Sequence, residues 1–500
     1  MRRHAPLLGL ILLGVAALYA NVSGAGFCGY DDFHEAYRAA FFDGRVPSRI
    51  LTAAHYEQFM YRPVTSALQL ATWQLFGHDP VAFRLRNLAM HLLATALVYG
   101  IAFLLGRSRA AAAGAALLFG FSPLANEAVV VAIWTNTTAY ALALASFFLF
   151  LLALDALDAG GHWALELLGS FGLGELAMFT YEPTIVVLGM MLAYLAICRS
   201  GRAPISRAFA LAFAAGCAVD LVFFFAVRHL LGITAAALLP AGEILRDMVE
   251  YLVALALPVD LVLQNALFAV PLPVSGQPVP HSTFVLPALY AIVVLIAFAL
   301  CLARPVRLRL ADADWPTLGF LLVSIPLVLV PIVLYKAHVS EFNLYVPAAL
   351  YAMLVALVLA HFCRNRTAFA AVLGLLLLSS LLGSWVRNGR VVACAQLAST
   401  ILSGLPLAAW RDGDWYVRLA TSPGERLKPR YGIYNYSGIK AIEVSETPIK
   451  GAQEAVRLAT GNDRVRVDVV SAPALERGCG RPETCFYVAP SGDVKEVVGR

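Results

Sequence analysis

The sequence predicts an all-α polytopic membrane protein with a small C-terminal domain, mixed α/β or β-rich, outside the membrane. Of its 500 residues, 60% are hydrophobic and only 14% are charged, whereas soluble domains average about 45–50% apolar and about 25% charged residues. The charges are concentrated near the C-terminus, because residues 387–500 hold 16 of the 37 Lys and Arg residues and 12 of the 32 Asp and Glu residues. We therefore expect a transmembrane domain at 1–392 and a soluble domain at 393–500.

We expect eleven spans, and all but the third, which is short, have about the length that a helix needs to cross a bilayer, roughly 17–25 residues. They are 5–22, 84–105, 110–123, 137–154, 163–180, 182–198, 206–228, 283–303, 317–335, 342–362 and 368–386. Residues 245–270 are also apolar, but four charged residues interrupt them. We expect an interfacial or re-entrant segment there rather than a span.

Arginine residues set the predicted orientation, because short cytoplasmic loops are rich in Lys and Arg. Arg2 and Arg3 precede the first span, and most loops that follow an even number of crossings are basic. The loop at 155–162 is the exception. Eleven crossings then put the tail outside a bacterial plasma membrane, or in the lumen of the endoplasmic reticulum of a eukaryote. A cleaved signal peptide at 1–20 is an alternative that leaves this orientation unchanged.

The tail contains short β-prone runs at 415–419, 439–444, 464–470 and 485–488, separated by turn-forming residues. This pattern predicts a small domain with several strands. Cys479 and Cys485 lie in the same tail, where an oxidising compartment would favour a disulfide between them. Two separate thiols are the alternative.

Acidic residues gather at the predicted external ends of the spans: Asp31, Asp32, Glu127, Glu182 and Glu341. Acids beside spans usually mark a site or a pathway, and packed helices would bring these ends round one cavity. Paired carboxylates can divide the work between a general base and a supporting group. The alternative for Asp31 and Asp32 is capping of a helix at 33–42. Glu182, which precedes Pro183, is also a plausible helix cap.

The loop at 33–83 is rich in aromatic residues and arginines, including Arg62, and suits short helices that lie in the membrane interface. In the following span, Arg84, Asn87 and His91 share one helical face. His91 is either a site residue or an ordinary buried, hydrogen-bonded histidine. Lys336 and His338 precede Glu341 and could neutralise a phosphate or pair with that glutamate.

Several function classes find no support in the sequence. It contains no phosphate-cradling Gly-rich loop, no His/Cys metal-ligand spacing and no Ser-His-Asp motif in a suitable context. No cluster of Lys and Arg suggests a nucleic-acid partner. ATP-driven transport is therefore unsupported, and we expect membrane lipids and no nucleic acid as partners.

Six short motifs occur in a fixed order along residues 1–390. They are Asp31-Asp32, Tyr61-Arg62-Pro63-Val64, Asn87 with His91, Ser122-Pro123 followed by Glu127-Ala128-Val129, Tyr181-Glu182-Pro183, and Glu341-Phe342-Asn343-Leu344-Tyr345-Val346-Pro347. In this order the chain resembles the GT-C class of polytopic glycosyltransferases. It looks closest to the transmembrane-and-tetratricopeptide-repeat protein O-mannosyltransferases and their bacterial relatives, although the repeats are absent.

This resemblance implies an inverting transferase that uses a polyprenyl-phosphate-linked sugar donor. The acceptor would be a hydroxyl group of a protein, a lipid or a polysaccharide. Asp32 would be the catalytic base and Asp31 its support, and a divalent cation beside them is compatible with the motif, although no cofactor is firmly implied. The implied substrate-binding residues are Arg62, Asn87, His91, Glu127, Glu182, Lys336, His338, Glu341 and Tyr345.

Three departures from the family pattern remove polar or cationic side chains, at Ser122, Tyr181 and Phe342. The last of these replaces an arginine, so that binding of the lipid phosphate would move to Lys336, His338 or Arg62. Two alternatives follow. A lipid or glycan flippase could use the intramembrane acids Glu175 and Asp220, and a catalytically degenerate member could act as a binding module through its tail.

Overall fold

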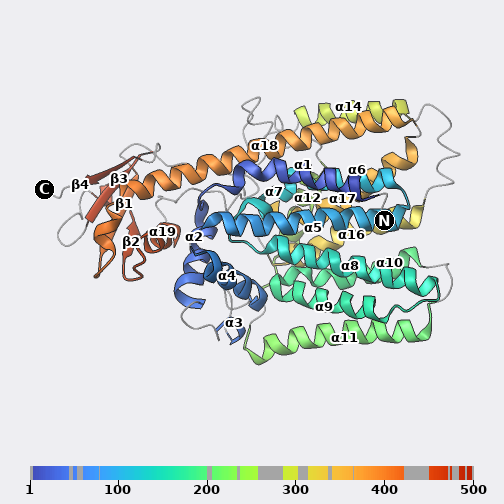
Figure 1. Cartoon of the computed structure of the whole chain (residues 1–500), viewed down its shortest axis with the longest axis horizontal. Coiled ribbons are helices and arrows are strands. Elements are labelled where there is room, and N and C mark those ends of the chain that lie inside the picture. Colours follow the sequence, from blue (N-terminus) through green and yellow to red (C-terminus); the bar gives the residue numbers. More distant parts are fainter. Residues whose placement is uncertain are drawn as a thin grey trace.

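The computed structural model shows a bundle of long helices, from which one helix continues into a small domain with a β-sheet (Figure 1). The structure describes residues 4–43, 49–52, 60–77, 79–199, 205–233, 237–256, 285–301, 314–335, 341–363, 365–421, 450–470, 473–475, 484–489 and 493–497. The N-terminus lies at the end of the bundle that faces away from the sheet domain (Figure 1).

Seven of the described helices are long and apolar enough to cross a membrane. They are α1 (Ala5–Ser23), α5 (Pro80–Gly106), α8 (Asn136–Asp158), α11 (Arg207–Leu230), α16 (Trp315–Val333), α17 (Tyr345–Phe362) and α18 (Arg366–Gly404). A further pair, α6 (Arg109–Gly120) and α7 (Pro123–Val130), passes the same test together but is bent by 55°. The shorter apolar helices are α9 (Ala164–Thr180), α10 (Val186–Cys198) and α14 (Val285–Cys301).

Each of the eleven predicted spans coincides with one of these helices. The prediction of a polytopic, mainly helical membrane protein is therefore confirmed. Only seven helices, or eight with the bent pair, satisfy the length requirement among the described residues, so the count of eleven crossings stays a prediction. The segment expected at the interface contains α12 (Ala241–Ala256), and its remainder lies outside the described residues.

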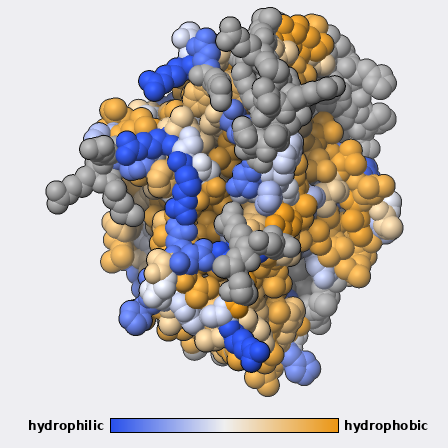
Figure 2. All heavy atoms as spheres, turned by 90° about the vertical axis from the view of Figure 1, so that its right-hand side faces the viewer, coloured by the Kyte–Doolittle hydropathy of each residue, from blue (hydrophilic) through white to orange (hydrophobic). Residues whose placement is uncertain are grey.

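Hydrophobic side chains are exposed along the flank of the bundle, as expected for a surface in contact with lipid. Leu211, Phe223 and Ile292 are among them, each at least 50% exposed. Figure 2 looks onto the end opposite the sheet domain and shows hydrophilic side chains there between broad hydrophobic areas.

Two ion pairs account for the acidic loop at 155–162, which interrupts the basic pattern of the loops on its side. Asp155 accepts hydrogen bonds from Arg107 at 2.6 and 2.9 Å. Asp158 forms a similar two-point contact with Arg199, at 2.6 and 2.8 Å. The acids therefore lie beside arginines of neighbouring connections, as the predicted alternation of sides requires.

Close helix packing depends on glycine at two crossings. A Cβ atom at Gly120 would lie 2.6 Å from a methyl group of Val15, and one at Gly216 would lie 2.2 Å from the ring of Phe171. Small residues allow transmembrane helices to approach in this way.

The loop after α1 forms short helices, as the sequence predicts. They are α2 (Gly29–Arg38), a π-helical turn at Ala39–Asp43, α3 (Arg49–Thr52) and α4 (Pro63–Phe76). Helix α2 begins earlier than the predicted helix at 33–42, and its N-cap residue is Cys28. Asp31 and Asp32 therefore belong to the helix and do not precede it.

Helix α18 continues without a break past the predicted domain boundary at residue 392 and leads into the tail. The tail is a mixed α/β unit with strands β1 (Tyr416–Thr421), β2 (Arg466–Val469), β3 (Thr484–Val488) and β4 (Val494–Val497), and helix α19 (Lys450–Thr460). The strand order is β2-β1-β3-β4, with β1 parallel to β2 and β3, and β4 antiparallel to β3.

Three of the four predicted strands match β1, β2 and β3, and the predicted run at 439–444 lies outside the described residues. Cys485 is disulfide-bonded, as the sequence suggested, and its partner also lies outside the described residues.

The tail and the first loop share one hydrophobic core. Phe33 and Tyr37 of α2 pack in the same cluster as Trp410, Val417 and Val456 of the tail. Helix α19 lies directly against α2. The tail is therefore packed onto the loop that carries the acid pair.

Candidate functional site

Asp32 lies in a buried joint between the first loop and the bundle. Its side chain is fully buried, and both carboxylate oxygens accept backbone hydrogen bonds. Oδ2 accepts the N–H of Cys28 at 3.0 Å, and Oδ1 accepts the N–H of Ile133 at 3.1 Å. Asp31 is part of the same helix, but its side chain lies outside the described part of the structure.

Arg84 of α5 lies beside Asp32 and contacts the same segments of the chain. Its Nη2 atom lies 3.7 Å from Asp32 Oδ2. The guanidinium also donates to the carbonyls of Val130 at 3.0 Å and Gly26 at 2.7 Å, and to that of Ala25. One buried arginine thus connects the segment before α2 with the last residue of α7.

The environment of Asp32 perturbs its acidity. Burial raises the pKa of the Asp32 carboxyl to about 6, although Arg84 and the backbone donors act in the opposite direction. A pKa near neutrality suits a general base. Full burial and the two occupied oxygens, however, suit a group that positions the backbone around it.

Asn87 and His91 continue along α5 and are also buried. Asn87 donates from Nδ2 to the carbonyls of Val131 at 2.8 Å and Ala132 at 3.2 Å. His91 is hydrogen-bonded through Nδ1 to the hydroxyl of Tyr345 at 2.7 Å and through Nε2 to the carbonyl of Gly120 at 3.1 Å. Both polar side chains therefore bind other parts of the chain.

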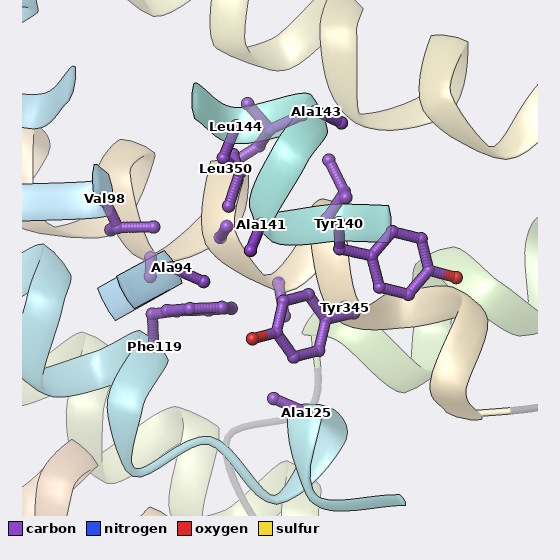
Figure 3. Packing of buried hydrophobic residues seen from close by; sticks show 14 of the residues in the cluster. Ala94, Val98, Phe119, Ala125, Tyr140, Ala141, Ala143, Leu144, Tyr345 and Leu350 are labelled. Atoms are coloured by element: carbon purple, nitrogen blue, oxygen red, sulfur yellow. The ribbon is translucent and has the colours of Figure 1, made fainter. Parts of the chain in front are cut away.

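Tyr345 belongs to an aromatic layer inside the bundle (Figure 3). Its ring stacks on Tyr140 at 5.1 Å between centroids and meets the edge of Phe119 at the same distance. Because its hydroxyl is bonded to His91, the Tyr345–His91 contact joins α17 to α5. This agrees with the structural alternative that the sequence left open for His91.

Glu127 anchors the segment in which the family arginine is replaced. The buried carboxylate accepts the backbone N–H of Phe342 at 2.9 Å. The ring of Phe342 packs against Trp134 at 4.5 Å and Tyr181 at 6.2 Å. A hydrophobic contact thus occupies the position where the family would place a cation.

Two arginines converge on Glu182, which lies in the 3-10 turn η2 (Glu182–Ile185). Arg62 donates from Nε to Glu182 Oε2 at 2.6 Å, and the Nη1 atom of Arg228 lies 3.7 Å from Oε1. The backbone N–H of Tyr61 also donates to Oε1, at 2.9 Å. The three charged side chains are 14–18% exposed, so this arginine pair, Arg62 and Arg228, is partly accessible.

The electrostatics around Arg62 favour its cationic form. Burial opposes the charge of Arg62, but Glu182 and other neighbouring groups raise the pKa of its guanidinium overall. Its guanidinium also lies 4.7 Å above the ring of Tyr181. Two guanidinium groups thus share the carboxylate of Glu182, and Glu35 also acts on Arg62.

A polar network leads from the arginine pair to a small cavity. The Tyr181 hydroxyl donates to Asn343 Oδ1 at 2.8 Å, and Asn343 Nδ2 donates to the Tyr251 hydroxyl at 2.9 Å. Asn343 lines a small cavity whose walls are otherwise mainly apolar; the lining includes Tyr140, Thr184, Met190, Val328 and Ile332. The cavity begins just below Glu182, because Pro183 and Thr184 also line it.

The structure brings only some of the predicted site residues together. Arg62 and Glu182 form an ion pair. The other described members are buried and bind other parts of the chain: Asp32, Asn87, His91, Glu127 and Tyr345. Lys336 and His338 lie outside the described residues, and Glu341 begins the turn η4 (Glu341–Leu344) with its side chain outside them. No group of three or more His, Cys, Asp or Glu suited to a metal ion is found in the described part, and the cation beside the acid pair stays a prediction.

Arg228 and Asn343 were not predicted as site residues. A signal for Arg228 was present, because an arginine at the predicted external end of a span runs against the usual positive-inside pattern. Asn343 lies in the last of the six motifs, but its hydrogen bonds to two tyrosines could not be predicted from the spacing of residues.

Helix α19 contacts the other side of α2. Arg457 donates to the Tyr37 hydroxyl at 3.1 Å, and His34 Nδ1 lies 3.5 Å from Glu454 Oε1. The helix that carries the acid pair is thus held between the bundle and the tail. The sequence contained no pattern that linked these segments.

No protein-family model matches the chain, and no curated protein matches it. Among solved structures it is similar to the oligosaccharyltransferase of Archaeoglobus fulgidus in the apo form, with a TM-score of 0.51, 11% identity and coverage of 94% of this chain and 64% of that chain. It is also similar to AglB from the same organism in complex with an inhibitory peptide and a dolichol-phosphate. The TM-score is 0.52 and the identity 12%, and the match covers 99% of this chain and 74% of that chain. For ArnT from Cupriavidus metallidurans in the apo state, the TM-score is 0.44 and the identity 13%, and the match covers 97% of this chain and 92% of that chain.

This chain thus spans 64% of the length of the apo oligosaccharyltransferase. At identities of 11–12%, the similarity concerns the fold. The predicted GT-C class fold is confirmed at this level, whereas the relation to the O-mannosyltransferases stays a prediction. The polytopic membrane fold of the chain is thus similar to that of the oligosaccharyltransferase of Archaeoglobus fulgidus.

Proposed function

We propose that the chain is an integral-membrane glycosyltransferase whose donor is a sugar linked to a polyprenyl phosphate. The observation that carries this proposal is the arginine pair around Glu182, placed directly above a mainly apolar cavity. The fold supports it, since a similar structure is described as a complex with an inhibitory peptide and a dolichol-phosphate.

The arginine pair suits a lipid phosphate. Guanidinium groups bind phosphate oxygens through charge-assisted hydrogen bonds, and a departing phosphate needs a cation nearby as its charge develops. Arg62 and Arg228 are partly exposed and share the carboxylate of Glu182. Lys336 and His338 are further candidates for the same role.

The apolar lining of this cavity suits contact with the lipid chain of such a donor. Its walls come from α8, α10, α16 and α17 and are mainly Val, Leu, Ile, Met and Ala. Asn343 and Tyr140 supply polar groups among them. A lipid chain that lies against this lining would place its phosphate near the end of the bundle that carries Glu182.

For the transfer step we assign the first-loop acids different roles from those expected. Asp31 accepts the proton of the acceptor hydroxyl, while Asp32 holds the backbone through Cys28 and Ile133. The acceptor oxygen bonds to the anomeric carbon, the bond to the phosphate oxygen breaks, and the configuration inverts. Asn87, His91, Glu127 and Tyr345 position the helices round this site, and Glu341 remains a candidate contact to the acceptor.

The test is release of polyprenyl phosphate by the purified chain incubated with a panel of polyprenyl-phosphate sugars. Arg228→Gln should lower release by roughly a hundredfold, as removal of a charge-stabilising donor does elsewhere. Arg107→Gln removes an arginine that is also ion-paired, to Asp155, at another site, and should leave release unchanged. Equal release by wild type and Arg228→Gln would contradict the role of the arginine pair.

A second candidate, transport of a lipid or glycan, is favoured by Glu175 and Asp220. Asp220 is 6% exposed, and its Oδ2 atom lies 3.9 Å from the position of a Cβ atom built on Gly174, the residue before Glu175. The two acids therefore meet between α9 and α11. Transport predicts movement of the substrate without a covalent change, which mass spectrometry of the acceptor separates from transfer.

A further inference from the structure

Two cysteines from distant parts of the chain meet beside the acid pair. Cys28 precedes α2 as its N-cap residue, and Cys394 lies on α18. Both are buried, with 0% and 3% exposure. Both carry thiols in this structure, and the two side chains are hydrogen-bonded to each other.

The backbone also brings these two segments together. A Cβ atom at Gly26 would lie 3.9 Å from the Cβ atom of Ala395, the residue after Cys394. Ala25, Cys28, Cys394 and Ala395 belong to one hydrophobic cluster. The meeting of the thiols therefore follows from packing of the whole segment on α18.

The redox environment at this end of the molecule is indicated by the tail. Cys485 of β3 is disulfide-bonded, and disulfides persist mainly in oxidising compartments. Helix α18, which contains Cys394, extends to the tail, and α2 packs directly on the tail helix α19 (Figure 1). The cysteine pair and the disulfide therefore lie at the same end of the bundle.

We propose that Cys28 and Cys394 form a disulfide that joins the start of α2 to α18. The two thiols lose two protons and two electrons and form one S–S bond. The electrons reduce the disulfide of a thiol–disulfide oxidoreductase to a dithiol, which is the usual exchange partner in such compartments. This proposal does not depend on glycosyl transfer.

The bond forms while the chain folds. In the folded protein the hydrogen bond with Cys394 and burial raise the pKa of the Cys28 thiol well above its usual range. A thiol that rarely ionises reacts slowly in exchange, so the reaction precedes complete burial. Because the N–H of Cys28 donates to Asp32, the bond fixes the residue that holds the acid-bearing helix.

The test is mass spectrometry of the full chain, denatured and alkylated with N-ethylmaleimide at harvest and digested without reductant. We expect a peptide in which Cys28 is linked to Cys394 and which disappears after reduction. Cys217 of α11 should be alkylated in the same sample. The disulfide at Cys485 reports on the compartment, since it forms only if this end has met oxidising conditions.

The proposal is wrong if Cys485 is disulfide-bonded while Cys28 and Cys394 are both alkylated. It is also wrong if all three are alkylated, because the compartment is then reducing. In Cys394→Ser the remaining Cys28 should become fully alkylated, and in Cys28→Ser the same should hold for Cys394. The wild-type measurement decides the question even if a variant fails to fold.

Discussion

Replacement of Asp32 by Asn should destabilise the fold and should not act as a simple loss of a catalytic base. The carboxylate accepts two backbone N–H groups, from Cys28 and Ile133, and lies 3.7 Å from the guanidinium of Arg84. An amide keeps one acceptor oxygen and turns an NH₂ group towards the second N–H. It also leaves Arg84 buried without its carboxylate.

The magnitude follows from these contacts. Breaking a buried ion pair from one side costs about 3–5 kcal/mol, because the remaining charge is uncompensated. A buried N–H without an acceptor adds about 1–3 kcal/mol. Removal of an ionised carboxyl whose pKa has risen from 3.8 to about 6 returns about 3 kcal/mol. The two costs together exceed this return by about 1–5 kcal/mol, which is the expected net loss.

The assay is equilibrium unfolding of the purified protein in mixed micelles, followed by release of polyprenyl phosphate under conditions where each variant is folded. Asp31→Asn is the matched control, because it makes the same change at the neighbouring position of the same helix. We expect Asp32→Asn to lose stability and Asp31→Asn to lose transfer. An Asp32→Asn variant with wild-type stability and no transfer would refute this reasoning and restore Asp32 as the base.

Three further predictions test other joints. Because the pKa of Asp32 is raised on folding, its stabilising contribution is complete below pH 4 and is lost as the pH rises through 6; wild type should lose about 3 kcal/mol over this window, and Asp32→Asn should not. His91→Phe leaves the buried Tyr345 hydroxyl without its partner, so unfolding should become easier by about 1–3 kcal/mol while transfer persists; loss of transfer at full stability would contradict this. Arg457→Met removes the hydrogen bond to Tyr37, so amide hydrogen exchange should become faster in α2 but not in α5. Equal protection of α2 in the variant and in wild type would contradict this prediction.

Local composition determined most of what could be predicted about the fold. A bilayer requires long apolar helices, so the eleven expected spans could be located without knowledge of their neighbours. Short β-prone runs between turn-forming residues indicated three of the tail strands, because this pattern is also local. The length of α18 could not be predicted in this way, because its last turns are stabilised by contacts with the tail and not by lipid.

Candidate site residues were harder to assign, because their roles depend on partners far away in the chain. The acids and arginines were visible as types, but whether a carboxylate faces an arginine or a backbone N–H depends on tertiary packing. Glu182 meets Arg62 and Arg228, whereas Asp32 is enclosed by Cys28 and Ile133.

The sequence by itself thus determined the class of the protein, a membrane bundle with a small tail, because hydrophobic burial depends on local pattern. Only the tertiary structure decided which charged groups meet, which thiols face each other and where the tail docks. These contacts join segments that are separated by tens to hundreds of residues, and no local spacing encodes them.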